Sequence, residues 1–182
     1  TYDYQRKLDK SFIADKNTYK DFIYNYRRKY GNEYFANEYD HFYYMYNYTN
    51  IIQKKNLFGE ALSLEKYEKK YVQRVKKIFN QPNTENYLDK MSYAFIKLHL
   101  PGILYHDDTA SMASSVELRV PFLDHRIVEF AISIPNKYKL KWISDKHQNK
   151  SKTLISDDIS EKNDITKYVL KEAFKEKIPN EI

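Results

Sequence analysis

The chain has 182 residues, no cysteine and a formal net charge of +6 at pH 7. The lack of cysteine excludes disulfides, thiolate chemistry and zinc fingers, and it fits a cytoplasmic, reducing compartment. No apolar run approaches the roughly 18 residues that a membrane span needs, and residues 1–20 are too polar for a signal peptide. Nineteen Tyr and ten Phe against three Gly predict a mainly α-helical fold with aromatic packing.

Residues 1–98 are predicted to form a helical, aromatic-rich segment. An aromatic stripe at helical spacing is more often a core face than a base-stacking platform. The first two predicted helices are 19–30, with Tyr19, Phe22, Ile23, Tyr26 and Tyr30 inward and Gly31 as the stop, and 33–56, with Phe35, Tyr39, Phe42 and Tyr46 inward. The next two are 64–79, capped by Ser63 with Leu64, Tyr67, Tyr71, Val75 and Ile78 inward, and 85–98, capped by Thr84.

Residues 99–182 form the second segment, in which prolines punctuate the pattern. Pro101 and Gly102 are expected to break the chain, and Asp108 to cap a short helix that runs through Ser114. Pro121 ends that passage. Asp124 occupies the N-cap position of a helix that ends near Pro135, and its buried face comprises Ile127, Val128, Ala131 and Ile132.

A long polar loop is predicted over 136–163, with a short strand near 138–143 and otherwise little sign of a sheet. Lysines surround Trp142 in this stretch, and we favour a solvated loop over a phosphate-binding surface for nucleic acid. Asp164 is then expected to cap a last helix that Pro179 ends, with Ile165, Tyr168, Val169 and Ala173 inward.

The most informative stretch is 111–135, where charged and apolar residues alternate around Pro121. Glu117 and Arg119 are two residues apart, so they share a face of an extended segment. Their apolar neighbours predict a packed turn in which each charge needs a partner or a ligand. We favour a structural ion-pair network over direct substrate contacts, and a capping role for Asp124 over that of a catalytic acid.

His106, Asp107 and Asp108 are consecutive polar residues with the chemistry to bind a divalent metal or to exchange protons. Adjacent residues on a helix do not share a face, so capping and solvation are the favoured interpretation. No metal site is predicted.

Several motifs occur here in a fixed order. They are residues 100–104 (Leu-Pro-Gly-Ile-Leu), Asp108, residues 111–113, Glu117-x-Arg119 with residues 120–126, residues 129–130, residues 167–173 and residues 178–182. In this order and spacing the chain resembles the C-terminal synthetase domain of glutamine-dependent asparagine synthases. The resemblance is specific between about 98 and 135, fair from 166 to 182, and weak before residue 90.

The resemblance implies the helical C-terminal part of an α/β adenine-nucleotide α-hydrolase-like (ATP pyrophosphatase) synthetase domain, with the parallel sheet mostly missing from this chain. Residues 1–98 and 99–182 would then belong to one domain. The family's Ser-Gly-Gly-x-Asp-Ser loop for ATP would lie upstream, and its catalytic lysine beyond Ile182. This stretch alone is therefore expected to be inactive.

The implied reaction uses ATP and magnesium to convert the side-chain carboxylate of aspartate into an acyl-adenylate. Ammonia, released from glutamine in an N-terminal glutaminase domain, then displaces AMP. By the resemblance, Asp108, Glu117, Arg119 and Asp124 support the wall of the aspartate-adenylate pocket. Many relatives carry one arginine near Tyr105 or His106 and another where this chain has Thr109. His106, when protonated, would supply a partial positive charge in place of the first arginine.

Two alternatives stay open. One is a related amidotransferase that acts on another carboxylate in cell-surface polysaccharide synthesis. The other is a non-catalytic helical interaction module in which the motif serves only packing. Neither nucleic-acid nor membrane binding is expected, whereas exposed apolar surface predicts self-association.

Overall fold

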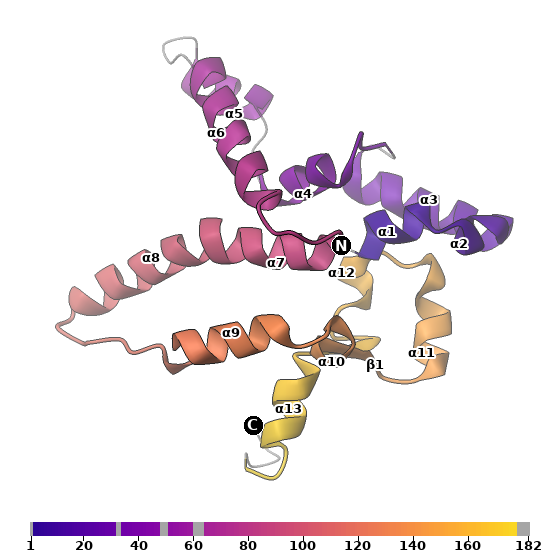
Figure 1. Cartoon of the computed structure of the whole chain (residues 1–182). Helices are drawn as coiled ribbons and strands as arrows, with labels where there is room; N and C mark the ends of the chain where they lie inside the picture. Colours follow the sequence, from indigo (N-terminus) through magenta and orange to yellow (C-terminus); the bar gives the residue numbers. More distant parts are fainter. Residues whose placement is uncertain (1, 32–33, 48–50, 60–63, 178–182) are drawn as a thin grey trace. The chain divides into compact units, whose positions relative to one another are not determined.

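A computed structural model describes residues 2–31, 34–47, 51–59 and 64–177 (Figure 1). It divides into two compact units, which we call unit 1 (residues 1–34 and 125–182) and unit 2 (residues 35–124). The boundary between the two predicted segments, residues 1–98 and 99–182, lies inside unit 2. The structure is mainly helical, so the predicted fold class is confirmed.

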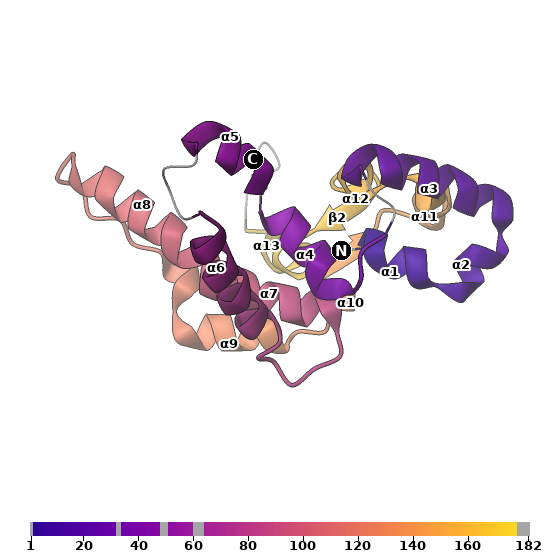
Figure 2. The ribbon, with the colours of Figure 1, turned by 90° about the horizontal axis from the view of Figure 1, so that it is seen from above.

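Unit 1 combines the two ends of the chain (Figures 1 and 2). Its first three helices are α1 (Tyr2–Leu8), α2 (Lys10–Ala14) and α3 (Lys16–Tyr30). The later elements are α9 (His125–Ser133), α10 (Asn136–Lys139), β1 (Leu140–Trp142), α11 (Asp145–Lys150), η2 (Ser151–Thr153), α12 (Ser156–Ile159), β2 (Asp164–Thr166) and α13 (Tyr168–Phe174).

Helix α3 forms because its ends carry strong local signals. The Asp15 side chain accepts a hydrogen bond from Thr18 N at 3.3 Å, which caps the first turn. Gly31 ends the helix in the left-handed conformation, with φ of 63°, which glycine adopts without steric cost. Phe22, Tyr26 and Tyr30 are buried, so the predicted helix over 19–30 is confirmed.

Arg6 joins the N-terminal helices to the C-terminal part of unit 1. Its guanidinium donates to the carbonyl oxygens of Leu154 at 2.6 Å and Ser151 at 3.0 Å, and also to that of Lys152. The same group lies 4.6 Å from the ring centroid of Phe22. Burial lowers the pKa of Arg6, with the charge of Asp3 opposing that shift.

The predicted strand near 138–143 is confirmed, since β1 pairs antiparallel with β2 and places Lys141 opposite Ile165. The predicted loop over 136–163 is wrong, because this stretch also contains α10, α11, η2 and α12. Ser144 caps α11 by accepting from His147 N at 3.4 Å, and Ile155 and Ile159 are buried around α12. Local caps and two buried side chains thus order a polar sequence.

Asp164 does not cap the last helix. It lies in β2, is buried, and accepts a hydrogen bond from Glu161 N at 2.8 Å. Helix α13 begins at Tyr168, after Lys167 turns the chain with φ of 53°. Ile165 and Tyr168 are half-buried, but Val169 and Ala173 are exposed, contrary to prediction. Pro179 lies outside the described residues.

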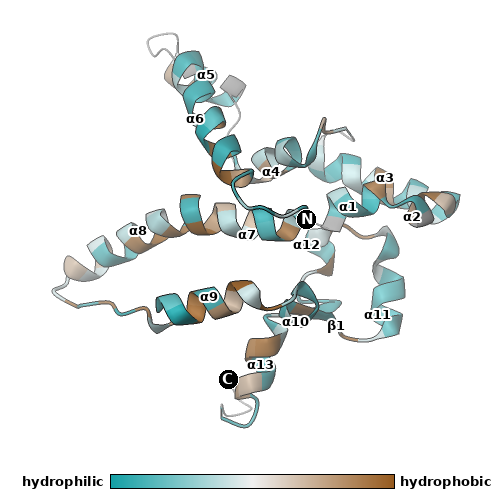
Figure 3. Ribbon diagram, viewed as in Figure 1, coloured by the Kyte–Doolittle hydropathy of each residue, from teal (hydrophilic) through white to brown (hydrophobic). Residues whose placement is uncertain are grey.

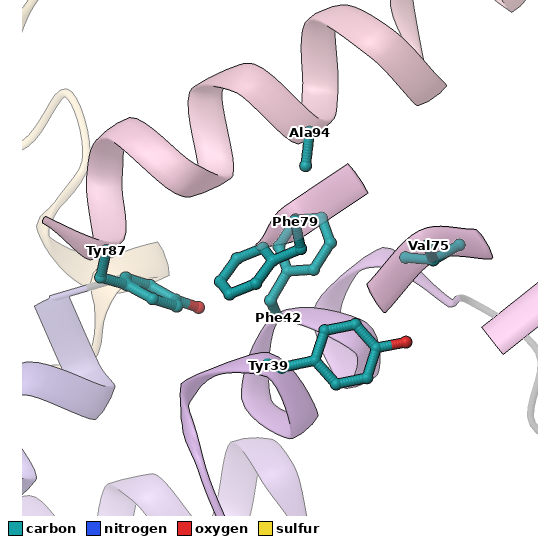
Figure 4. Close-up of a cluster of buried hydrophobic side chains, with 6 residues drawn as sticks. All are labelled: Tyr39, Phe42, Val75, Phe79, Tyr87 and Ala94. Carbon is teal, nitrogen blue, oxygen red and sulfur yellow. The ribbon is translucent and has the colours of Figure 1, made fainter. Parts of the chain in front are cut away.

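Unit 2 is a helical assembly. Its elements are α4 (Glu38–Tyr46), α5 (Ile51–Phe58), α6 (Leu64–Phe79), α7 (Tyr87–Leu98), α8 (Leu100–Met112) and the 3₁₀ turn η1 (Pro121–Leu123). Its core is a cluster of six buried side chains from α4, α6 and α7, shown in Figure 4: Tyr39, Phe42, Val75, Phe79, Tyr87 and Ala94. The rings of Phe42 and Phe79 stack with centroids 4.8 Å apart.

The single helix predicted over 33–56 is wrong, because two helices occupy this region. Asn37 caps α4 by accepting from Asp40 N at 3.0 Å, and Asn47 ends it in an extended conformation. Tyr39 and Phe42 are buried as expected. Asparagine at both boundaries gives the backbone an alternative to helical hydrogen bonding.

The predicted bounds of α6 are confirmed, although Ser63 lies outside the described residues. Its inward face is only partly correct, since Val75 is buried but Tyr67 and Tyr71 are exposed. Thr84 does not cap α7 directly. Asn86 does so by accepting from Leu88 N at 2.9 Å, while Thr84 Oγ1 accepts from Asn86 N at 3.0 Å.

Alkaline pH is expected to destabilise unit 2 through its buried tyrosines. Burial, reinforced by the charge of Asp40, raises the pKa of Tyr39 to about 12, against about 10 in an unfolded chain. Between these values the unfolded state binds fewer protons than the native state, so stability falls as the pH rises. Urea midpoints at pH 9, 10 and 11 should show this fall.

The matched variant is Tyr39→Phe, which removes the ionisable group but also the hydrogen bond that Tyr39 Oη donates to Val72 O at 2.9 Å. It should be less stable than the wild type at pH 9 by about 0.5–1.5 kcal/mol. This difference in stability should become smaller as the pH rises, because only the wild type loses stability through ionisation of Tyr39. If stability falls with pH equally in both proteins, Tyr39 is not the group responsible.

Candidate functional site

The motif region begins on α8, which starts one residue before Pro101. Proline lacks an N–H group, but the first-turn N–H groups of a helix have no intrahelical acceptor, so Pro101 is tolerated there. The predicted break at Pro101 and Gly102 is therefore wrong. Asp108 lies in the interior of α8 rather than at its N-cap, and its carbonyl accepts from Ser111 Oγ at 3.0 Å.

His106 and its neighbours lie on the solvent-exposed part of this helix. His106 Nδ1 is 3.5 Å from Asp107 Oδ1, with the two side chains 82% and 46% exposed. Asp108 is also exposed. Within the described ranges, no group of three His, Asp or Glu side chains is placed to hold a metal ion.

Glu117 and Arg119 pair with each other in the extended stretch that follows α8. The guanidinium Nη2 lies 2.8 Å from Glu117 Oε1, and both side chains are mostly exposed. The spacing of two residues thus places the charges on one face, as expected. The predicted packed turn is wrong in this chain, because Val116, Leu118, Val120 and Phe122 are all exposed.

The segment continues through η1 to Asp124, the residue that directly precedes α9 in the sequence. Helix α9 ends at Ser133, two residues before Pro135. Its apolar face was predicted to be buried, but Ile127, Ala131 and Ile132 are exposed and Val128 is half-buried. In Figure 3, brown hydrophobic positions alternate with teal hydrophilic ones along α9.

Of the predicted site residues, the structure brings Glu117 and Arg119 together as an ion pair. No hydrogen bond or ion pair in the described part of the chain joins that pair to His106 or Asp108. What the motif region presents is a paired guanidinium and carboxylate among exposed apolar side chains. Such a surface can bind a carboxylate or phosphate through Arg119 and apolar partners around it.

Two clusters outside the motif region were not predicted. Asp3 is fully buried in unit 1 and accepts hydrogen bonds from Tyr30 and Ser156. A cavity of about 450 Å³ in the same unit is lined partly by Tyr19 and Arg27. The i, i+4 spacing of residues 19, 23 and 27 places them along one side of α3, next to its buried residues. No comparable signal marks Asp3, because its partners are distant in sequence.

Among the described helices, none is long and apolar enough to cross a membrane.

Comparison with known proteins identifies relatives. The chain is 54% identical over 43 residues to "Putative asparagine synthetase [glutamine-hydrolyzing] 1" of Methanocaldococcus jannaschii, which covers 24% of this chain and 8% of that protein. It is 31% identical over 108 residues to "Asparagine synthetase [glutamine-hydrolyzing] 1" of Bacillus subtilis, covering 59% and 14%. It is 32% identical over 97 residues to "Amidase chyE" of Penicillium rubens, covering 52% and 12%.

These alignments span only 8–14% of the length of the three relatives. The comparison with solved structures gave no significant match. The family model described as Asparagine synthase matches residues 4–182, which is nearly the entire chain. The motif order that suggested this family is thus supported by a match across both units, and the chain belongs to the asparagine synthase family.

Proposed function

We propose that this chain is the helical part of a synthetase domain in a longer amidotransferase. The proposed reaction activates the side-chain carboxylate of aspartate with ATP as an acyl-adenylate and amidates it with ammonia derived from glutamine. The observation that carries the proposal is the family match over residues 4–182. The small share of each relative that the alignments cover supports a larger parent protein with a separate glutaminase domain.

Arg119 is the residue of this chain best suited to meet a substrate. A guanidinium donates two parallel hydrogen bonds to a carboxylate or phosphate, and Glu117 at 2.8 Å holds it in orientation. In the parent, other parts of the domain would cover the exposed Val120 and Phe122 and exclude water from this pair. Asp124 would fix the start of α9, and His106 and Asp108 would line the neighbouring wall.

ATP and magnesium would act together in the parent, where the metal ion balances phosphate charge during adenylate formation. The described residues suit the anionic substrate better than the metal, since they contain no cluster of three potential ligands. We therefore assign magnesium to none of the described residues. Cytoplasmic localisation remains part of this proposal, as does the absence of membrane and nucleic-acid partners.

The acceptor defines a second candidate, a related amidotransferase that acts on another carboxylate. It is favoured by the similarity to a protein named as an amidase and by Tyr105 and Thr109, where many relatives carry arginine. Tyr105 is 76% exposed, and its carbonyl accepts from Thr109 Oγ1 at 2.7 Å. Neither side chain can supply the permanent positive charge of arginine.

The test is AMP release by the full-length parent supplied with ATP, magnesium and ammonium chloride. Ammonium bypasses the glutaminase step. We expect AMP formation that depends on aspartate, together with asparagine as product. Formation of AMP with a different carboxylate would support the second candidate, and no AMP with any carboxylate would refute both.

Arg119→Met should lower kcat/KM for the acceptor by at least about tenfold, since a charge-assisted hydrogen bond is lost. The matched control is Arg74→Met, which removes an exposed arginine of α6. It should leave kcat/KM unchanged. A packing role for the motif would instead be favoured if both variants lost kcat/KM equally. It would also be favoured if circular dichroism showed that Arg119→Met is unfolded.

A further inference from the structure

Helix α6 carries a dense array of positive charges on its solvent-exposed side. Six of its sixteen residues are basic, and all six side chains are exposed: Lys66, Lys69, Lys70, Arg74, Lys76 and Lys77. The opposite side of the helix packs in the core of unit 2 through Val75 and Phe79, which are fully buried. Figure 3 shows mostly hydrophilic residues along α6. The packing of the helix therefore fixes the basic side as the side that faces solvent.

The two glutamates of α6 do not neutralise these charges. Lys54 Nζ donates to Glu68 Oε2 at 2.8 Å, and Lys55 pairs with Glu65, so both carboxylates are bound to lysines of α5. In an isolated helix, Glu65 is instead well placed to pair with Lys69 four residues later. The fold uses both carboxylates to hold a neighbouring helix, which leaves the basic side of α6 uncompensated from within the helix.

Five of the six basic side chains have no hydrogen-bond, ion-pair or aromatic partner among the described residues. The sixth is Lys76, whose Nζ lies 5.6 Å from the ring centroid of Tyr39. Lys66 and Lys70 are four residues apart, a spacing at which like charges on a helix repel each other. The five charges lie within about 17 Å along the helix axis. An acidic partner that spans this length relieves the repulsion of several of them at once.

Part of this basic side has the spacing of a surface that pairs with another helix. We call it the basic strip, and it consists of Lys66, Tyr67, Lys70, Gln73 and Lys77. Residues 66, 70, 73 and 77 recur in steps of four, three and four, which keeps one face of a helix against a second helix along its length. Tyr67, next to this row, is 65% exposed and supplies an aromatic ring of the kind enriched at protein–protein interfaces.

Two other anionic partners fit the basic strip less well. Helices that bind membrane surfaces bury an apolar face between the lipids, but the apolar face of α6 is already packed in the core of unit 2. Proteins that bind single-stranded nucleic acid combine a groove with several stacking rings, whereas the strip lies on the outer side of one helix and has one ring. A second helix with carboxylates in the same steps instead meets each of the three lysines.

We propose that the basic strip binds an acidic α-helix of another protein, in which glutamates recur in steps of four and three residues. Those glutamates pair with Lys66, Lys70 and Lys77, and an apolar side chain beside them packs on Tyr67. The surface is distinct from the motif region and gives the chain a partner beyond the proposed amidation reaction. Exposed ion pairs are weak singly and are screened by salt, so the complex forms reversibly and responds to ionic strength.

The probe is an alanine-based peptide of about 20 residues that carries glutamates in steps of four and three and a leucine beside them. The control peptide has the same composition, but its glutamates are distributed evenly around the helix. Both are titrated into the 182-residue chain by isothermal calorimetry. At about 150 mM salt, where diffuse attraction is screened, we expect the first peptide to bind at least about fivefold more tightly than the control.

Two double variants remove the same charge from different sides of α6. Lys70→Gln with Lys77→Gln changes the basic strip, and it should weaken binding of the first peptide by at least about fivefold. Lys69→Gln with Lys76→Gln is the matched control, since these lysines lie four and eleven residues after Glu65, on the side nearer α5. It should weaken binding less than about twofold. All four side chains are exposed, so both variants should keep the helical content of the wild type in circular dichroism.

A charge exchange tests the pairing directly. Lys70→Glu with Lys77→Glu should bind a version of the first peptide with lysines in place of glutamates, at least about fivefold more tightly than the wild type does. The proposal is wrong if the two glutamate peptides bind equally, or if the two glutamine double variants lose affinity equally, because either result indicates diffuse attraction to a basic surface. It is also wrong if the first peptide does not bind. If phosphatidylserine vesicles or a single-stranded oligonucleotide bind through Lys70 and Lys77 instead, the partner is a lipid surface or a nucleic acid.

Discussion

Replacing Phe79 by alanine is expected to lower the free energy of unfolding of unit 2 by about 3–5 kcal/mol. Phe79 is fully buried at the centre of the cluster in Figure 4. Its ring stacks on Phe42 at 4.8 Å and lies within 6 Å of the rings of Tyr39 and Tyr87. Removing it deletes contacts with α4 and α7 together and leaves a cavity that helices on three sides can close only partly.

The matched control is Phe58→Ala, which makes the same chemical change in α5 of the same unit. Phe58 is 51% exposed, so its loss should cost less than about 1 kcal/mol. Urea denaturation followed by circular dichroism, with hydrogen exchange on α7 as a local readout, compares the two variants. Similar losses for both would show that the aromatic cluster is not the main source of stability in unit 2.

Helix α3 shows what local sequence signals can predict. Its aromatic residues recur at helical spacing, Asp15 is a strong N-cap residue and Gly31 is a strong stop, so its face and its end were both predictable. The start at Lys16 rather than residue 19 adds the first turn, which carries no apolar residue. Helix α6 was likewise predictable in its bounds, because its hydrophobic period continues without interruption to Phe79.

The region 136–163 shows where local signals fail. Its polar composition is typical of a loop, yet the chain forms short helices there. Residues far along the sequence stabilise them: Arg6 binds the carbonyls of 151, 152 and 154, and Asn25 Nδ2 donates to Thr153 O at 2.9 Å. Such contacts bridge more than 100 residues, so no window of local sequence contains them.

The pairing of Glu117 with Arg119 was predictable from the sequence, but the exposure of the apolar residues around them was not. The spacing of Glu117 and Arg119 correctly predicted that they share a face, and the motif order correctly predicted the family. Val120, Phe122 and Ile127 were predicted to be buried, but they are exposed, because contacts that would cover them do not form within the described residues. An apolar pattern indicates that a surface is suited to packing, but it does not identify the packing partner.

Asp3→Ala is expected to destabilise unit 1 by about 3–5 kcal/mol, because it breaks a buried polar network. Asp3 is fully buried and accepts from Tyr30 Oη at 2.9 Å, Ser156 N at 2.9 Å and Ser156 Oγ at 2.8 Å. Lys29 Nζ lies 3.7 Å away. Without the carboxylate, a buried hydroxyl and a backbone N–H lose their acceptor in a place where water does not replace it easily.

Asp157→Ala provides the matched control, since the same lysine serves both carboxylates. Lys29 Nζ lies 2.7 Å from Asp157 Oδ1, which makes this the shorter ion pair, but the Asp157 side chain is 71% exposed. Water solvates the exposed pair, so its loss should cost about 0–1 kcal/mol. Thermal unfolding and the hydrogen-exchange rate of the Ser156 amide measure both variants. Asp3→Ala should lose more stability than Asp157→Ala, because burial matters more here than the length of the ion pair. A greater loss of stability for Asp157→Ala would contradict the role assigned to Asp3 in joining α1, α3 and α12.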